Sequence, residues 1–323
     1  MNNILGRQII YGGKLASYDA ACKRLLSNRV ILAWILKSCL KEYRACEISE
    51  IAERYLEEGA QVGQLAIHPD ERSVGQQIRG TAGEDVSIGE GTVSFDIRFC
   101  AWTPGERSVR GKRLIIDIEA QKNFYPGYPI IMRGVYYGCR MISSQHGVEF
   151  TDSQYGNIKK VYSIWICMKP PKKRRGTINR YCMQEEKLEG NAGEAKENYD
   201  LLEVIMICLG EEESSTGILR LLEVLLSSVR SAAEKIRILQ EEFQIATTGE
   251  LEQEVRDMCN LSEGVLEQGI EIGLERGKRE GHIDGIFTSL KNLMESMNWS
   301  AGQAMDALKI PKEERERYGR LLR

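Results

Sequence analysis

Two neighbouring segments in which apolar and polar residues alternate constrain the fold more than any other feature of this chain. In TVSFDIRFC (92–100) the apolar residues at every second position share one predicted face: Val93, Phe95, Ile97 and Phe99. RLIIDIEAQ (113–121) alternates in the same way, and the turn-rich link TPGERSVRG (103–111) separates the two segments. A period of two is typical of strands with one buried face. The sequence therefore predicts a β-hairpin at the centre of the fold.

The segments around this hairpin predict helices on both sides of it. Apolar residues recur at near-helical spacing in 18–44, 47–58 and 127–145, whereas VSI (86–88) and KKVYSIWICM (159–168) are typical of strands. The predicted order is helix, three strands, helix, strand. We therefore expect an α/β fold in which helices flank a mixed sheet.

Charge divides the chain into two unlike parts. Residues 1–190 carry 28 Lys and Arg against 21 Asp and Glu, whereas residues 191–323 carry 16 against 26. A basic part can bind a polyanion, and an acidic part can keep a protein soluble or contact a partner. Because 323 residues suffice for about two domains, we expect one domain over 1–210 and a mostly helical, acidic tail over 211–323.

The tail contains a repeat in which every fourth residue is glycine, at positions 269, 273, 277, 281 and 285. Each glycine inside a helix costs about 1 kcal/mol relative to alanine. Close approach of a second helix would offset this cost, so we expect a homo-oligomer that forms through residues 265–290. A poorly formed linker helix is the alternative, and the charged residues between the glycines exclude a membrane helix.

Composition excludes several other classes of protein. The nine cysteines form no CxxC pair, and most lie in apolar runs, so we expect free, buried thiols and neither disulfides nor a zinc site. Three isolated histidines make His-based catalysis a poor expectation. The chain shows neither an apolar run of membrane-spanning length nor a signal-peptide pattern, and we expect a cytoplasmic protein.

The predicted hairpin brings carboxylates together. If the strands pair symmetrically about the link, the residue numbers of each cross-strand pair sum to 215, so that Asp96 lies opposite Glu119, Arg98 opposite Asp117, and Ser94 opposite Gln121. Two opposed carboxylates repel unless a cation neutralises them, and Mg²⁺ or Mn²⁺ is the natural one. A solvated sheet face is the alternative for Asp96 and Glu119, and pairing with Arg98 gives Asp117 a structural or supporting role.

Three longer segments make a family resemblance specific: SIGEGTVSFDIRF, IEAQKNFYPGYPIIMRGVYYGCRMIS and KKVYSIWICM. Together with the αβββαβ order, they resemble the Rpn family of recombination-promoting nucleases and transposases, within the PD-(D/E)XK nucleases. The resemblance covers nearly the whole chain. It implies a restriction-endonuclease-like core and a metal-dependent DNA endonuclease associated with mobile elements and DNA recombination.

Position by position, the resemblance implies that Asp96 and Glu119 are catalytic metal ligands and that Gln121 is the third catalytic residue. Gln121 stands where the wider superfamily has lysine. A glutamine can orient water but supplies no positive charge. Phe95 precedes Asp96, so the PD dipeptide of the motif is absent. These departures concern the rate more than the fold.

Three further groups of residues are weaker candidates. Asp19 and Lys23, at i and i+4 of the first helix, are candidates to support the site or simply to form a local ion pair. Candidate DNA contacts come from the 127–145 helix and from the basic loop 169–176: Arg133, Tyr136, Tyr137, Arg140, Lys172, Lys173, Arg174 and Arg175. The alternative for the helix residues is an ordinary structural role at a helix–sheet boundary. The alternative for the loop cations is exposure to solvent in a loop that binds nothing.

The sequence leaves three functions open. The first is a Mg²⁺-dependent DNA endonuclease. The second is a DNA-binding relative with weak or no catalysis. The third is a protein-interaction module that works through the helical tail, with the core as its scaffold.

Overall fold

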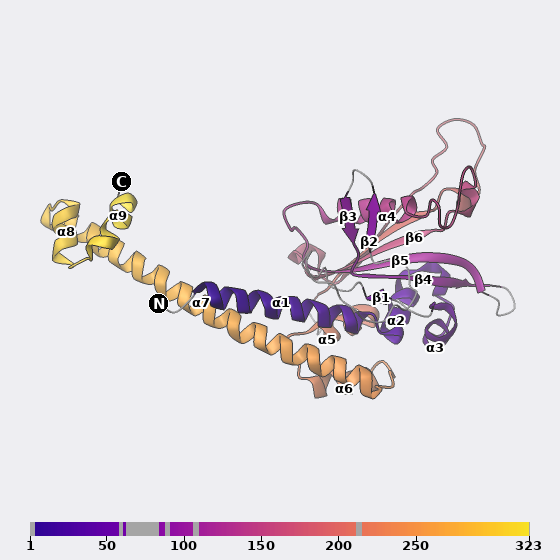
Figure 1. Ribbon diagram of the computed structural model, residues 1–323, viewed down its shortest axis with the longest axis horizontal. Helices are drawn as coiled ribbons and strands as arrows, with labels where there is room; N and C mark the ends of the chain where they lie inside the picture. The colour runs from indigo at the N-terminus through magenta and orange to yellow at the C-terminus, as the bar shows by residue number, and fades with distance from the viewer. Residues whose placement is uncertain are drawn as a thin grey trace. The chain divides into compact units, whose positions relative to one another are not determined.

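The computed structural model describes residues 4–57, 61–62, 84–87, 91–105, 110–210 and 215–322 (Figure 1). Contacts divide the chain into two compact units. One unit is Gly13–Ser262, and the other combines Met1–Gly12 with Glu263–Arg323. The first unit contains the sheet and every candidate site residue, and the second is helical.

A mixed sheet of six strands forms the centre of the first unit within the described residues. Its order is β1-β4-β5-β6-β8-β7, and β2 and β3 form a separate two-stranded hairpin. The bounds are β1 Gln61–Val62, β2 Glu84–Ser87, β3 Gly91–Ser94, β4 Ile97–Pro104, β5 Arg110–Asn123, β6 Val161–Lys169, β7 Thr177–Cys182 and β8 Leu202–Cys208. β5, β6 and β8 are parallel, and β4 and β7 pair antiparallel at either side of them.

Helices cover the two faces of the sheet unequally. One face packs against α1 (Ile4–Leu26), α2 (Arg29–Cys39), α5 (Gly217–Leu226), α6 (Ala232–Glu241) and the start of α7 (Gly249–Met297) in a large apolar core. The other face packs against α4 (Ile130–Ser143) in a smaller core. Figure 1 shows α4 on one side of the sheet, with α2 and α5 on the other. The expectation of a mixed sheet flanked by helices is confirmed.

α4 approaches the sheet closely because glycines line its inner face. A Cβ atom at Gly134 would lie 2.8 Å from Cγ1 of Val204 and 2.9 Å from Nε1 of Trp165. At Gly138 an added Cβ would collide with the side chain of Leu202. The close approach lets Arg133 and Tyr137 of α4 pack against Trp165 of β6.

Two predicted elements are interrupted in the structure. The helix expected over 18–44 breaks after Leu26, because Asn28 caps α2 by accepting a hydrogen bond from the Val30 N–H at 3.1 Å. The helix expected over 47–58 is a short α3 (Ile48–Glu50) that continues as a π-helical turn, Ile51–Tyr55.

The strand expected over 92–100 bends at residues 95–96, so β3 ends at Ser94 and β4 begins at Ile97. The bend turns Phe95 to the face covered by α4, where it joins Tyr137, so placing it with Ile97 was wrong. Ser94 pairs with Glu84 of β2, so the expected pairing of Ser94 with Gln121 was also wrong.

The second unit is helical, as expected for the tail. The end of α7 packs with α8 (Ala301–Ala307) and α9 (Lys312–Leu321) around Leu290, Met305 and Tyr318. α7 runs unbroken through the glycine repeat, and an added Cβ at Gly273, Gly277, Gly281 or Gly285 would meet nothing within 4 Å. Within the described chain, no helix combines the length and apolarity needed to cross a membrane.

Gly134→Ala tests the close packing of α4. Alanine gains about 1 kcal/mol of helix propensity, but forcing a methyl group against Val204 and Trp165 typically costs about 1–3 kcal/mol. We expect a net loss of up to about 2 kcal/mol in the free energy of unfolding, measured by urea denaturation. Gly156→Ala is the matched control, because a Cβ there meets nothing within 4 Å. Equal stability of the two variants would show that α4 does not depend on Gly134.

Candidate active site

Asp96 and Glu119 lie beside each other where β4 begins. The register expected for β4 and β5 is confirmed at Arg98, which pairs with Asp117, and Ile97 pairs with Ile118 in the same register. The Asp96 N–H donates to Oε1 of Glu119 at 2.9 Å, and Oδ2 of Asp96 accepts from the N–H of Ala120 at 3.1 Å. Each carboxylate therefore accepts a hydrogen bond from the main chain of the opposite segment. The bend at residues 95–96 places Asp96 where it can make these two bonds.

Polar side chains form a row along β5 on the face covered by α4. Asp117, Glu119 and Gln121 occupy alternate positions, in register with Ser163, Trp165 and Cys167 of β6. Asp117 is fully buried, Glu119 is 4% exposed, and Gln121 is half-buried near the end of the strand. The row runs from the protein interior to the surface, and Gln121 is its outermost member.

Asp117 is a buried acid without hydrogen bonds. Neither carboxylate oxygen has a hydrogen-bond partner among the described residues, although Arg98 lies opposite in the register. Burial, then Glu119 and Asp96, raise the pKa of Asp117 well above its usual range, and Arg98 and Arg133 only partly offset the shift. A buried carboxyl group with no hydrogen-bond donor beside it is costly to ionise, which agrees with the raised pKa.

Glu119, like Asp117, has a raised pKa because it is buried close to another acid. Burial, followed by the negative charge of Asp96, raises the pKa of Glu119 to about 8. The backbone hydrogen bond from Asp96 and the charges of Arg133 and Lys23 act in the opposite direction. Because the ionised form is destabilised, the pair binds a proton readily, and it would bind another cation for the same reason.

Lys23 reaches this site from α1. Its ammonium nitrogen lies 2.8 Å from Oδ1 of Asp96 and 2.6 Å from Oδ2 of Asp19. Burial lowers the pKa of Lys23, but Asp96 and Asp19 together raise it above its ordinary value. Lys23 therefore stays protonated at neutral pH. The structure brings both supporting candidates from α1 to Asp96, and Lys23 supplies a positive charge that Gln121 lacks.

Arg133 approaches the row from α4. Its guanidinium donates to the hydroxyls of Tyr128 at 2.8 Å and Tyr137 at 2.6 Å, and it lies over the ring of Trp165 at 5.3 Å. The negative charge of Glu119 contributes to the raised pKa of Arg133. Sequence reasoning treated Arg133 and Tyr137 only as candidate DNA contacts, whereas the structure ties both to the acidic row.

Tyr136 and Arg140 lie further along α4. Arg140 donates to the Tyr136 hydroxyl at 3.1 Å. Tyr136 is 45% exposed, whereas Arg140 is buried. Of this pair, Tyr136 is the residue that the surface presents to a ligand.

The basic loop adjoins the segment that follows β5. Lys172–Arg174 form one short 3₁₀ turn after β6, and Lys172, Lys173 and Arg175 are exposed. The Arg174 guanidinium lies 4.6 Å from the ring centre of Phe124. Because β5 and β6 are parallel, their carboxyl ends reach the same edge of the sheet. The loop therefore lies at the edge toward which the row from Asp117 to Gln121 runs.

One signal in the sequence marks this edge. Residues 120–148 contain three lysines and arginines and residues 158–184 contain eight, and neither segment contains an aspartate or glutamate. The two segments follow β5 and include β6, the basic loop and β7. Lys160 and Arg180 pair with Asp200 and Glu203, but Lys172, Lys173 and Arg175 are exposed and give the surface beside the acidic row a charge opposite to that of the row, which suits a polyanion.

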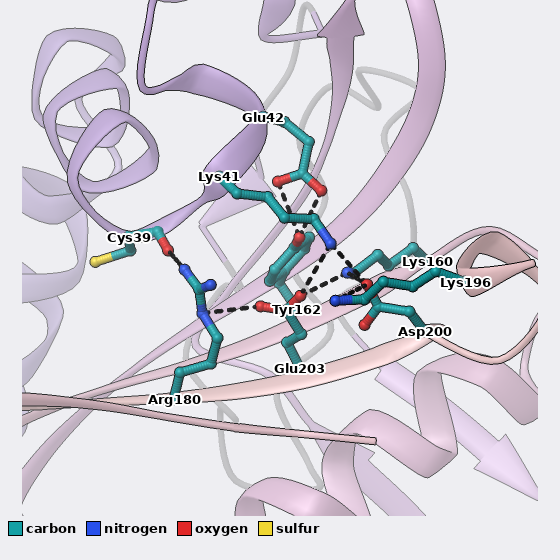
Figure 2. Close-up of polar contacts among 9 residues, drawn as sticks. All are labelled: Cys39, Lys41, Glu42, Lys160, Tyr162, Arg180, Lys196, Asp200 and Glu203. Carbon is teal, nitrogen blue, oxygen red and sulfur yellow. Dashed lines mark hydrogen bonds and ion pairs between the residues drawn. The ribbon is translucent and has the colours of Figure 1, made fainter. Parts of the chain in front are cut away.

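A second cluster of buried acids is paired with more basic side chains (Figure 2). Asp200 and Glu203 are each at most 5% exposed, but Lys160 lies 2.8 Å from Asp200 and 2.6 Å from Glu203. Lys41 lies 2.6 Å from Asp200, and Arg180 lies 3.0 Å from Glu203. Although burial opposes it, these hydrogen bonds and charges lower the pKa of Asp200. Asp117 and Glu119 are buried to a similar extent, but fewer basic side chains lie near them, and their pKa values are raised instead of lowered.

The donor set suits a divalent cation that brings its own water and substrate ligands. Among the described residues, no group of three or more His, Cys, Asp or Glu side chains is arranged to hold a metal ion. Mg²⁺ typically takes only one or two carboxylates from the protein and completes its shell with water and phosphate oxygens. Asp96 and Glu119 meet that requirement.

Comparisons with known proteins leave the site to be judged by its own geometry. No family model, no curated protein and no solved structure matches this chain. The paired acids, the protonated Lys23 and the carboxylate-free basic edge are therefore the observations from which a function can be argued.

The raised pKa of Glu119 predicts a dependence of stability on pH in the absence of metal. Between the ordinary glutamate value of about 4.3 and the folded value of about 8, the folded chain holds a proton that the unfolded chain has lost. Stability therefore falls as pH rises through this window, by at most about 1.4 kcal/mol per pH unit for this group. We expect the melting temperature in EDTA to fall from pH 5 to pH 8.

Glu119→Gln should flatten this fall, because the amide does not ionise. Glu197→Gln is the control: Glu197 is exposed and its pKa is lowered by Lys112, so it does not titrate in this window. An identical pH slope in Glu119→Gln and wild type would show that the Glu119 carboxyl is not held in its protonated form.

Proposed function

We propose that this chain is a metal-dependent DNA endonuclease that hydrolyses phosphodiester bonds, of the restriction-endonuclease-like, PD-(D/E)XK type found in the Rpn family. The observation that carries the proposal is the pair of hydrogen bonds that holds Asp96 beside Glu119, on the strand where Asp117 is buried with no hydrogen-bond partner among the described residues. Two adjacent carboxylates at a basic edge of the sheet, one of them buried with a raised pKa, are suited to hold a cation against a phosphate.

Asp96 and Glu119 are the residues that would hold Mg²⁺ or Mn²⁺. When bound, the metal would polarise the scissile phosphate and lower the pKa of a bound water. The backbone hydrogen bonds to Asp96 Oδ2 and Glu119 Oε1 fix the two carboxylates before substrate arrives. Such pre-organisation avoids a rearrangement at the moment of reaction.

Lys23 and Gln121 take different roles in this proposal. Lys23 remains charged beside Asp96, so it cannot act as a base and instead stabilises negative charge that develops on the phosphate. Gln121, at the outer end of the row, orients the attacking water by hydrogen bonding. Lys23, from α1, thus supplies the charge expected from a lysine at position 121.

The basic edge would position the DNA backbone. Lys172, Lys173 and Arg175 are exposed beside the carboxyl ends of β5 and β6. Contacts of this kind with phosphates give affinity without reading base sequence. The helical tail, with exposed glycines at positions 273, 277, 281 and 285, remains our candidate for self-association.

A DNA-binding relative without catalysis is the second candidate, and one contact favours it. The ion pair between Lys23 and Asp96, at 2.8 Å, neutralises an acid that a metal would otherwise use. If that pair persists in the presence of Mg²⁺, the basic edge would bind DNA that the acids do not cleave. The two candidates differ in metal-dependent cleavage.

Nicking of a supercoiled plasmid under single-turnover conditions with Mg²⁺ or EDTA tests the endonuclease. We expect cleavage with Mg²⁺ only, and Asp96→Asn or Glu119→Gln should abolish it by removing a metal ligand. Lys23→Met keeps the length of the side chain but removes its charge, and it should slow cleavage about 100-fold, as losing one transition-state donor typically does. Lys37→Met, on α2, is the matched control and should keep the wild-type rate.

Thermal melting separates loss of chemistry from loss of fold. Mg²⁺ should raise the melting temperature of wild type and not that of the Asp96→Asn, Glu119→Gln double variant, because a ligand of the folded state stabilises it. Wild-type cleavage by a folded Asp96→Asn variant would contradict the proposed metal site.

A further inference from the structure

The surface next to the acidic row is unusually aromatic for one that faces solvent. Five large side chains after β5 and along the outer side of α4 are exposed by 41–71%: Tyr125, Tyr128, Met132, Val135 and Tyr136. We call these five residues the aromatic surface. The inner side of α4 packs on the sheet through Ile130, Gly134 and Met141, so this outer side is an additional apolar face that the core does not use.

The aromatic surface is connected to the candidate active site. Tyr128 accepts a hydrogen bond from Arg133, whose charge acts on Glu119. Tyr125 lies beside Phe124, with ring centres 4.9 Å apart, and Arg174 of the basic loop lies over Phe124. A ligand on the aromatic surface would therefore meet the basic loop and the acidic row together.

Charge complementarity identifies the ligand as a polyanion with apolar, flat groups. The segments that form the aromatic surface and the basic loop contain no aspartate or glutamate between residues 120 and 148 or between 158 and 184. Exposed tyrosines among cations provide stacking for bases and charge for phosphates, the combination used by proteins that bind single strands. In a duplex the base faces are stacked on one another, so only unpaired bases could use these tyrosines.

We propose that the aromatic surface stacks unpaired bases, so that the strand crossing the site is single-stranded or locally melted DNA. This inference rests on the proposed endonuclease function for the identity of the polymer, and it adds the form in which that polymer binds. Phosphates of the same strand lie on Lys172, Lys173 and Arg175, and the bases lie on Tyr125 and the outer side of α4.

Fluorescence anisotropy of the full chain in EDTA tests this proposal without cleavage. The probes are labelled oligo(dT), a mixed-sequence DNA duplex and oligo(rU), each of about 20 nucleotides per strand, a length that exceeds the usual single-strand site. We expect wild type to bind oligo(dT) more tightly than the duplex. Tyr125→Ala should raise the Kd for oligo(dT) at least about 5-fold, the lower range for loss of one base–aromatic stack, and should leave the Kd for the duplex unchanged. Tyr125→Trp should retain tight binding.

Tyr155→Ala is the matched control. Tyr155 is exposed to the same extent as Tyr125, 64%, but belongs to the segment that leads into β6 at its amino end. The Tyr155→Ala variant should bind every probe with the wild-type Kd. Lys172→Ala with Lys173→Ala should weaken single-strand and duplex binding together and reduce the salt dependence of both.

Several results would overturn the proposal. These are equal effects of Tyr125→Ala and Tyr155→Ala, tighter binding of the duplex than of oligo(dT), and tighter binding of oligo(rU) than of oligo(dT). A wild-type dimer that Tyr125→Ala converts to monomer, with no change in DNA binding, would assign the surface to a second copy of the chain. Single-strand binding as predicted, in a protein that does not nick with Mg²⁺, would overturn the endonuclease and support the stacking surface.

Discussion

The burial of two carboxyl groups, Asp117 and Glu119, on one face of a sheet is the constraint on which the rest of the site depends. Buried acids are stable only when protonated, paired or bound to a cation. At Asp200 and Glu203 the fold supplies lysines and an arginine at ion-pair distance. The acids of β5 have less positive charge close to them. Lys23 contacts Asp96, and Arg133 donates its hydrogen bonds to Tyr128 and Tyr137. The row therefore retains capacity for a cation, and it lies at the edge where a basic surface can bring a phosphate.

The elements that surround the row each have a physical reason for being there. The glycines of α4 let that helix approach β6 and β8, and Arg133 and Tyr137 pack against Trp165 of β6. The bend at residues 95–96 turns the main chain so that Asp96 and Glu119 bind each other's backbone region. The parallel pairing of β5 and β6 brings the loops after both strands to one edge. The paired acids, a basic loop and an aromatic surface thus occupy adjacent places.

Much of this arrangement could be predicted from the sequence, and the exceptions have physical causes. The hairpin register followed from symmetric pairing about a turn-rich link. The register shifts between Trp102 and Pro104, near the link, and this shift does not affect the pairing of Arg98 with Asp117. The change of face at Phe95 could not be predicted, because a bend reverses the alternation without changing which residues are apolar. β7 was not recognised because its residues are mostly exposed and carry little apolar pattern. The position of Lys23 next to Asp96 depends on packing between elements far apart in the chain, whereas the carboxylate-free segments were visible in the sequence.

The central claim is that Asp96 and Glu119 share a divalent cation. Anomalous diffraction from crystals soaked with Mn²⁺ tests it most directly, because Mn²⁺ scatters distinctly and accepts the same oxygen ligands as Mg²⁺. The account predicts one Mn²⁺ peak within about 2.0–2.4 Å of carboxylate oxygens from both residues, distances typical of such hard cations, with the Lys23 ammonium displaced from Oδ1 of Asp96. Soaked crystals with no Mn²⁺ at this place, and with the ion pair between Lys23 and Asp96 intact, would contradict it.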